Sequence, residues 1–90
     1  MSVEFYKEVA RYRPLIIHAK TGESFDLIAV VLQDDTGKLW LRYSHTYRDK
    51  PEKGFYYPDS IISPKSLDEA EKKVREWSEN LAQSHEVAPW

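Results

Sequence analysis

One polar and aromatic stretch, residues 43–50, holds the side-chain types that an enzyme would need. In a catalytic interpretation His45 is the general base, Asp49 orients it, and Ser44 or a tyrosine is its partner. Side chains alternate along a strand, so Ser44 and His45 are expected on opposite faces, which argues against a direct pair. The sequence therefore favours a solvated loop. A small enzyme centred on His45 is the weakest of three functional hypotheses.

Residues that bind a metal ion, a phosphate group or a cofactor are sparse in the sequence. The three histidines, His18, His45 and His85, belong to separate predicted elements, and no His-x-x-x-His motif or carboxylate cluster accompanies them. The glycines are isolated, so they form no glycine-rich phosphate-binding loop. The sequence has no cysteine, which excludes a disulfide scaffold, a thiolate zinc site and a cysteine nucleophile. We therefore expect no metal and no cofactor.

Basic and aromatic side chains interleave between residues 38 and 54, where basic residues outnumber acidic ones. Single-stranded nucleic acid is held by stacking its bases on aromatic rings beside arginine. The same basic residues would also keep an edge strand soluble, and the net charge of -2 gives no general attraction to nucleic acid. A single-stranded nucleic-acid-binding domain is therefore the second hypothesis. Its contacts would be Lys38, Trp40, Arg42, Tyr47, Arg48, Lys50 and Lys53.

Segment 67–83 carries the clearest structural pattern. Ser66 is a typical N-cap residue, its spacing to Glu69 is that of a capping box, and Pro64 ends the preceding segment. These features predict an amphipathic helix over 67–83, whose apolar stripe needs a surface to pack against. The stripe comprises Leu67, Ala70, Val74, Trp77 and Leu81.

The residues before the helix predict a β-meander, because apolar runs are separated by turns that end in glycine. The turns are Thr21-Gly22 and residues 34–37. The strands are expected at 15–20, 24–33 and 38–44, with a short fourth strand at 54–57. The fold class is therefore α+β: a small, mostly antiparallel, curled sheet of three to five strands with the C-terminal amphipathic helix packed on one face.

The two ends of the chain are less regular. Residues 4–12 fit a helical face and a strand about equally, and Pro14 ends either one. Residues 85–90 have no clear pattern. We expect one domain over 1–84, followed by a tail over 85–90.

The short turns also predict which residues share a face of the sheet. A two-residue loop at Thr21-Gly22 places His18 opposite Phe25, and a four-residue loop at 34–37 places Val31 opposite Trp40. The aliphatic face, expected to seat the helix, comprises Leu15, Ile17, Ala19, Ile28, Val30, Leu32, Leu39, Leu41 and Tyr43. The second face comprises Ile16, His18, Phe25, Leu27, Ala29, Val31, Trp40, Arg42 and Ser44.

The second face is too apolar to stand exposed, since each large side chain left in water forgoes roughly 1.5–3 kcal/mol. The N-terminal segment, residues 55–57, curling of the sheet or a second copy of the chain would cover it. The first hypothesis is therefore a non-catalytic protein-interaction or regulatory module, with a homodimer as one form. Its contacts would be His18, Phe25, Trp40 and Arg42.

The chain shows no basic region followed by an apolar run at its start, and its longest apolar run, 27–32, is too short to span a bilayer. A cytoplasmic protein with no membrane partner is the expected setting.

Overall fold

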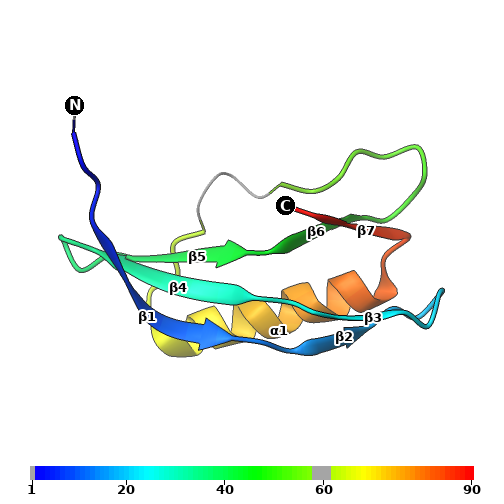
Figure 1. The fold of residues 1–90 in the computed structure, drawn as a ribbon, viewed down its shortest axis with the longest axis horizontal. Coiled ribbons are helices and arrows are strands. Elements are labelled where there is room, and N and C mark those ends of the chain that lie inside the picture. The colour runs from blue at the N-terminus through cyan, green and yellow to red at the C-terminus, as the bar shows by residue number, and fades with distance from the viewer. Residues whose placement is uncertain (1, 58–61) are drawn as a thin grey trace.

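A computed structural model describes residues 2–57 and 62–90 of the chain. Within those ranges the fold is a small α+β domain with mostly antiparallel strands and one C-terminal helix, which confirms the predicted class (Figure 1). The strands are β1 (Tyr6–Tyr12), β2 (Leu15–Ile17), β3 (Ser24–Asp26), β4 (Ala29–Asp34), β5 (Leu39–Tyr43), β6 (His45–Arg48) and β7 (Glu86–Pro89), and the helix is α1 (Leu67–Gln83).

The N-terminal segment is a strand, which resolves the ambiguity of residues 4–12. β1 pairs antiparallel with β4 and forms one edge of a three-stranded sheet in the order β1-β4-β5. The register shifts by one residue between Glu8 and Ala10, so Val9 forms a β-bulge. The N-terminal segment therefore extends the sheet beside β4 and does not lie across its second face.

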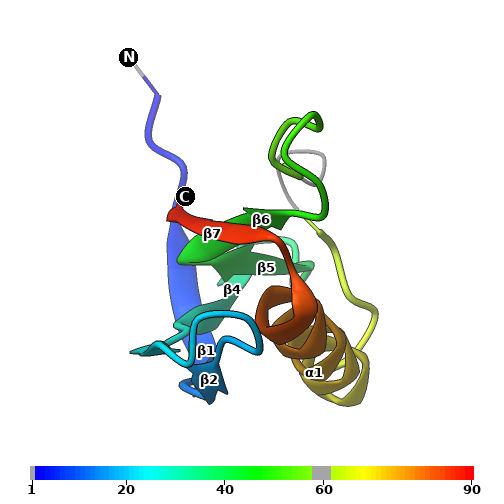
Figure 2. The same ribbon diagram turned by 90° about the vertical axis from the view of Figure 1, so that its right-hand side faces the viewer.

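The strand expected over 24–33 is interrupted near the middle of the molecule, beside the break that Pro14 was expected to cause. Pro14, which cannot donate a backbone hydrogen bond, lies between β1 and β2, and Leu27 lies between β3 and β4. The predicted strand 24–33 is thus two strands. Beyond the interruption the sheet becomes two separate ladders, β2-β3 and β6-β7, which diverge from each other (Figure 2).

The divergence begins at Ser44, between β5 and β6. The Ser44 N–H donates to the Ile28 carbonyl oxygen and the Ser44 carbonyl oxygen accepts from the Trp90 N–H, each at 2.9 Å. The N–H and C=O of an extended residue face the same edge of its strand. The edge that β5 presents to β4 is therefore continued by the edge that β6 presents to β7. Residues 86–89, expected in a tail, are therefore a strand paired with β6.

The register of the β4–β5 hairpin differs from the predicted one by a single residue. The loop has three residues, with Gly37 at φ 88°, because the Asp34 N–H already donates to the Lys38 carbonyl oxygen at 3.0 Å. Val31 therefore lies opposite Leu41, and not opposite Trp40. A shift of one residue exchanges the faces of β5, so the predicted composition of both faces was wrong for this strand.

The β2–β3 hairpin differs from the prediction by two residues, which leaves its faces unchanged. Ile16 pairs with Phe25, and the His18 N–H donates to the Glu23 carbonyl oxygen at 2.8 Å across a four-residue loop. Gly22 has a φ of 72° in this loop, a conformation that glycine adopts readily.

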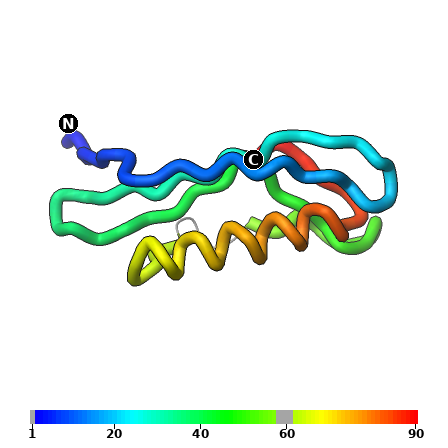
Figure 3. Tube along the Cα trace, turned by 90° about the horizontal axis from the view of Figure 1, so that it is seen from below, coloured from blue at the N-terminus to red at the C-terminus, as the bar shows by residue number. Residues whose placement is uncertain are grey.

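Helix α1 begins and ends where the sequence predicts, and the Ser66 Oγ accepts from the Glu69 N–H at 3.1 Å. It runs along the length of the sheet (Figure 3). The face it covers is not the predicted aliphatic one, since Leu15 and Ile17 are 62% and 61% exposed. The buried apolar side chains are Ile16, Leu27, Ala29, Val31, Leu41, Tyr43, Tyr47, Ala70, Val74 and Leu81.

The stretch 54–57 is not a strand, although the Tyr56 N–H donates to the Tyr47 carbonyl oxygen at 2.8 Å. Nothing in the two described ranges forms a helix with the length and apolarity that crossing a membrane requires.

Candidate functional site

The structure separates the four residues expected to form one protein-binding surface. His18 and Phe25 line a hollow at the end of the molecule where the two ladders diverge. Trp40 and Arg42 lie on the opposite side of the sheet, because the three-residue β4–β5 loop turns them away from the helix. The hypothesis placed these residues on one face, and that placement depended on the incorrect register.

The outward side chains of β5 are partnered by their own neighbours. The Trp40 indole N–H donates to the Asp34 Oδ2 at 2.9 Å, and the Lys38 Nζ lies 4.4 Å from the Trp40 ring centroid. The Arg42 guanidinium lies 5.8 Å from the Tyr6 ring. Hydrogen bonds from the Thr36 hydroxyl and the Trp40 indole lower the pKa of Asp34 to about 2.

The residues proposed to contact nucleic acid are also distributed over different parts of the fold. Tyr47 is only 8% exposed and packs against Tyr56, with ring centroids 5.0 Å apart. Arg48 forms an ion pair with Glu86, and its guanidinium lies 5.1 Å from the Phe55 ring. Lys50 and Lys53 lie exposed in the following loop, away from the β5 residues on the outer face.

All three histidines line a single hollow of about 430 Å³. Sequence reasoning missed this convergence because the residues lie 27 and 40 positions apart, on three elements whose pairing the local pattern does not specify. Among the described residues there is no group of three or more histidine, cysteine or acidic side chains arranged to hold a metal ion. The lining residues are His18, Thr21, Glu23, Phe25, His45, His85, Glu86, Val87, Ala88 and Pro89.

His18 joins the β2–β3 hairpin to the end of the helix. Its Nε2 lies 2.8 Å from the Ser84 carbonyl oxygen and its Nδ1 lies 3.1 Å from the Thr21 Oγ1. The Nε2 must carry a proton to donate to a carbonyl, so Nδ1 of the neutral ring accepts from the hydroxyl. Both ring nitrogens have partners, and His18 is a structural part of the hollow wall.

Ser44 and His45 are in direct contact, contrary to the prediction from strand alternation. The Ser44 Oγ lies 2.7 Å from the His45 Nδ1, at the bend between β5 and β6. The Ser44 Oγ also accepts from the Ile28 N–H at 2.9 Å. Burial lowers the pKa of His45, whose ring centroid is 4.6 Å from that of Phe25.

The acid expected to orient His45 is engaged elsewhere. Ser44 is not among the residues that line the hollow. Asp49, the expected orienting acid, instead accepts a hydrogen bond from the Tyr56 hydroxyl at 2.9 Å. The contact joins two neighbouring residues at the point where the two ladders diverge, and the Ser44 Oγ also holds the Ile28 N–H there.

β3 and β7 both contribute residues to the hollow, and within the described residues each has one edge without a strand partner. Two hydrogen bonds fix which backbone groups of β3 face β2. The Leu27 N–H donates to the Pro14 carbonyl oxygen, and the His18 N–H donates to the Glu23 carbonyl oxygen. The backbone groups of Ser24 and Asp26 therefore face away from β2. By the same alternation, those of Val87 and Pro89 face away from β6. Within the described part of the chain, neither β3 nor β7 pairs with a strand on this second edge.

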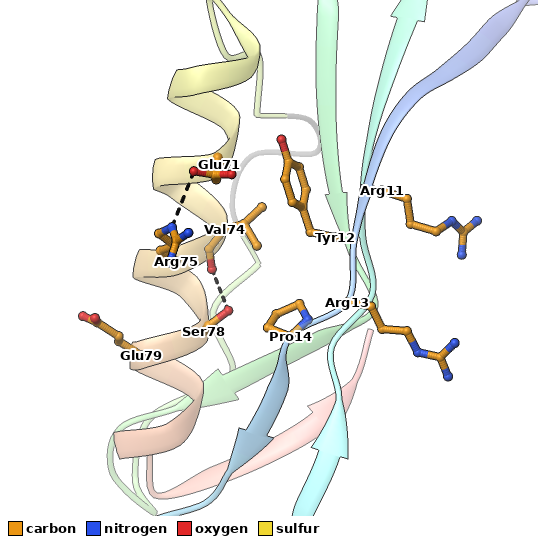
Figure 4. A pocket seen from close by; sticks show the side chains of 9 residues that line it. All are labelled: Arg11, Tyr12, Arg13, Pro14, Glu71, Val74, Arg75, Ser78 and Glu79. Atoms are coloured by element: carbon orange, nitrogen blue, oxygen red, sulfur yellow. Dashed lines mark hydrogen bonds and ion pairs between the residues drawn. The ribbon is translucent and has the colours of Figure 1, made fainter.

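A second hollow, of about 540 Å³, lies between β1 and α1 and does not gather reactive groups. The side chains of Arg11 and Arg13 point away from the helix (Figure 4). Arg75 lies 3.6 Å from Glu71 on its own helix. The space between the elements is bordered by Tyr12 and Val74, so this hollow is a gap in packing beside the core.

Comparison of the chain with protein-family models, with curated proteins and with solved structures finds no match.

Proposed function

We propose that the chain is a non-catalytic protein-interaction module that binds an extended peptide segment of a partner in the β3–β7 hollow, the space lined by Phe25, His45 and residues 85–89. A single observation carries this proposal: two strands border the same hollow, and each has an edge that pairs with no strand in the described residues. A cytoplasmic location remains part of the proposal.

The backbone chemistry of the hollow suits an added strand. An exposed strand edge is a template for a further extended chain, which gains main-chain hydrogen bonds from the edge and side-chain contacts from the pockets beside it. β3 offers the N–H and C=O groups of both Ser24 and Asp26. β7 offers fewer donors, because Pro89 has no N–H. The peptide is therefore expected to pair with β3 and to pack its side chains against β7.

The walls of the hollow provide apolar contacts as well as polar ones. Phe25 and Val87 stand on opposite sides of it, and both are half-buried. Of the two acidic residues that line it, Glu86 pairs with Arg48, and Glu23 lies exposed. We expect main-chain pairing together with apolar burial to provide the principal attraction for a peptide ligand.

A display library of random dodecapeptides, selected against the immobilised chain, tests the proposal. Enriched peptides should shift the backbone amide resonances of Ser24, Asp26 and Val87 in ¹⁵N-labelled protein. Phe25→Ala should weaken their binding at least about fivefold, because a central aromatic anchor is lost. Leu15→Ala changes an exposed side chain on the other face of the same hairpin and should leave binding unchanged.

Val87→Arg, which obstructs the hollow from its other wall, provides a second variant if Phe25→Ala does not fold cooperatively. Enriched peptides that bind both variants normally, or that shift Trp40 and Arg42 instead, would overturn the proposal. Trp fluorescence quenched by oligothymidylate, with no peptide enriched, would favour the nucleic-acid hypothesis. If light scattering shows a dimer and the β3 amides are protected from hydrogen exchange, the segment bound in the β3–β7 hollow belongs to a second copy of the chain.

A further inference from the structure

A small aromatic pocket lies on the edge of β6 opposite to β7. Four aromatic side chains, Tyr47, Tyr56, Tyr57 and Trp77, line its space of about 200 Å³, and we call this the aromatic pocket. Two hydrogen bonds hold Tyr56 against β6. The Tyr56 N–H donates to the Tyr47 carbonyl oxygen at 2.8 Å, and the Tyr56 carbonyl oxygen accepts from the Thr46 hydroxyl. The pocket is therefore separate from the β3–β7 hollow.

The rings of the aromatic pocket are inclined to one another and do not form a stack. The Tyr47 and Trp77 centroids are 4.9 Å apart with their planes at 65°, and those of Tyr47 and Tyr56 are 5.0 Å apart at 52°. Trp90 supports the outer side, with its ring 5.7 Å from that of Tyr57 at 72°. The inclined rings border a shallow hollow that is open to solvent.

Two of the four rings have hydrogen-bond partners for their polar atoms. The Trp77 indole N–H donates to the His45 carbonyl oxygen at 3.0 Å, and the Tyr56 hydroxyl donates to the Asp49 Oδ2 at 2.9 Å. A ligand in the pocket would therefore meet ring faces and edges more than free donors. Aromatic faces carry negative quadrupole potential and attract cations.

Two acidic side chains, Asp49 and Glu76, lie close enough to tyrosines of this aromatic cluster to affect their pKa values. Burial raises the pKa of Tyr47, and the nearby Asp49 carboxylate raises it further. Burial and the nearby Glu76 raise the pKa of Tyr43, whose ring stacks on Trp77 at 4.7 Å. The lining residues include no lysine or arginine. The guanidinium of Arg48 pairs with Glu86 and lies 5.1 Å from the ring of Phe55.

We propose that the aromatic pocket binds a methylated ammonium group, such as a trimethyl-lysine side chain or a free choline-like cation. A quaternary ammonium group cannot donate hydrogen bonds and is more weakly hydrated than a primary ammonium group, so it is the cation best suited to aromatic walls. The space equals that of roughly six or seven water molecules in the liquid, which suits one compact cationic headgroup. This inference does not depend on peptide binding in the β3–β7 hollow.

Choline chloride and its uncharged carbon isostere, 3,3-dimethyl-1-butanol, test the role of charge. Titration of the intact chain, followed through the Trp77 indole resonance, should give saturable choline binding, with the isostere at least about fivefold weaker. Equal affinities would mean an apolar pocket only and would overturn the proposal. Trimethyl-lysine and unmodified lysine peptides distinguish the source of the cation: a preference for the methylated peptide over choline identifies a protein side chain. Binding of neither probe would also overturn the proposal.

Tyr57 provides a matched pair of variants because it is 57% exposed and so contributes little to folding. Tyr57→Phe keeps the aromatic face and should leave choline affinity within about twofold, whereas Tyr57→Leu keeps apolar bulk and should weaken it about three- to fivefold. Equal behaviour of the two variants would contradict a cation–π contact at this wall. The Trp40 indole resonance, far from the pocket on the outer face of β5, provides an internal control for non-specific effects.

Discussion

The indole N–H of Trp77 on α1 donates to the carbonyl oxygen of His45, at a distance of 3.0 Å. This hydrogen bond connects the two proposed sites. The His45 ring lines the β3–β7 hollow, and the Trp77 ring lines the aromatic pocket on the other edge of β6. The helix therefore positions β6 at the point where the strand separates one site from the other.

Removing this donor should lower the free energy of unfolding by more than the loss of buried apolar area alone would. Trp77→Phe leaves the His45 carbonyl without its partner, which is expected to lower the free energy of unfolding by about 1–3 kcal/mol. Urea unfolding with a shared m-value measures the change. Trp40→Phe is the control: its indole donates to the accessible Asp34, so water can replace the bond and the loss should be smaller. Equal losses in the two variants would contradict this assignment.

The centre of the core should be sensitive to truncation at Leu27. Its side chain is 0% exposed, so Leu27→Ala is expected to lower the free energy of unfolding by about 2–5 kcal/mol through lost burial and a residual cavity. Leu15→Ala, at a site 62% exposed, should change it by less than about 0.5 kcal/mol. Thermal and urea unfolding measure both. A larger effect at Leu15 would mean that the outer face is covered in solution, for example by a second copy.

The helix should depend on its first turn. Ser66→Ala removes the acceptor for the Glu69 N–H and is expected to cost about 1 kcal/mol, whereas Ser66→Asp retains an acceptor and a favourable charge near the helix N-terminus and should cost much less. Circular dichroism during urea unfolding distinguishes the two variants. Similar losses in both would show that the cap contributes little.

The turn at Asp34 should make the stability of the fold depend on pH in the acidic range. The pKa of Asp34 is held at about 2, below the usual value of about 3.9 for aspartate, first by the Thr36 hydroxyl and then by the Trp40 indole. Because the folded-state pKa is lower, the unfolded chain binds more protons between these values. The stabilisation is thus present above about pH 4 and is lost as the pH falls toward 2. Asp34→Asn should lower the melting temperature at pH 6 and have a smaller effect near pH 2. A constant difference across this range would contradict the assignment.

Local features determined the parts of the structure that the sequence predicted well. The helix over 67–83 was predicted with its bounds and its cap, because capping and the apolar stripe involve residues within a few positions of each other. Glycine also marked both hairpin turns correctly, at Gly22 and Gly37, since each adopts a positive φ. The α+β class followed from these elements together.

Tertiary pairing decided what those local features leave open. The loop before Lys38 has three residues and not four, and this one-residue difference turned Trp40 to the outer face, because side chains alternate along a strand. Residues 6–12 and 86–89 carry weak local signals and became strands only through pairing with β4 and β6. The sequence by itself therefore determined the helix, the turns and the fold class. The meeting of His18, His45 and His85 in one hollow, and of four aromatic rings in another, required contacts between residues far apart in the chain, which no local pattern encodes.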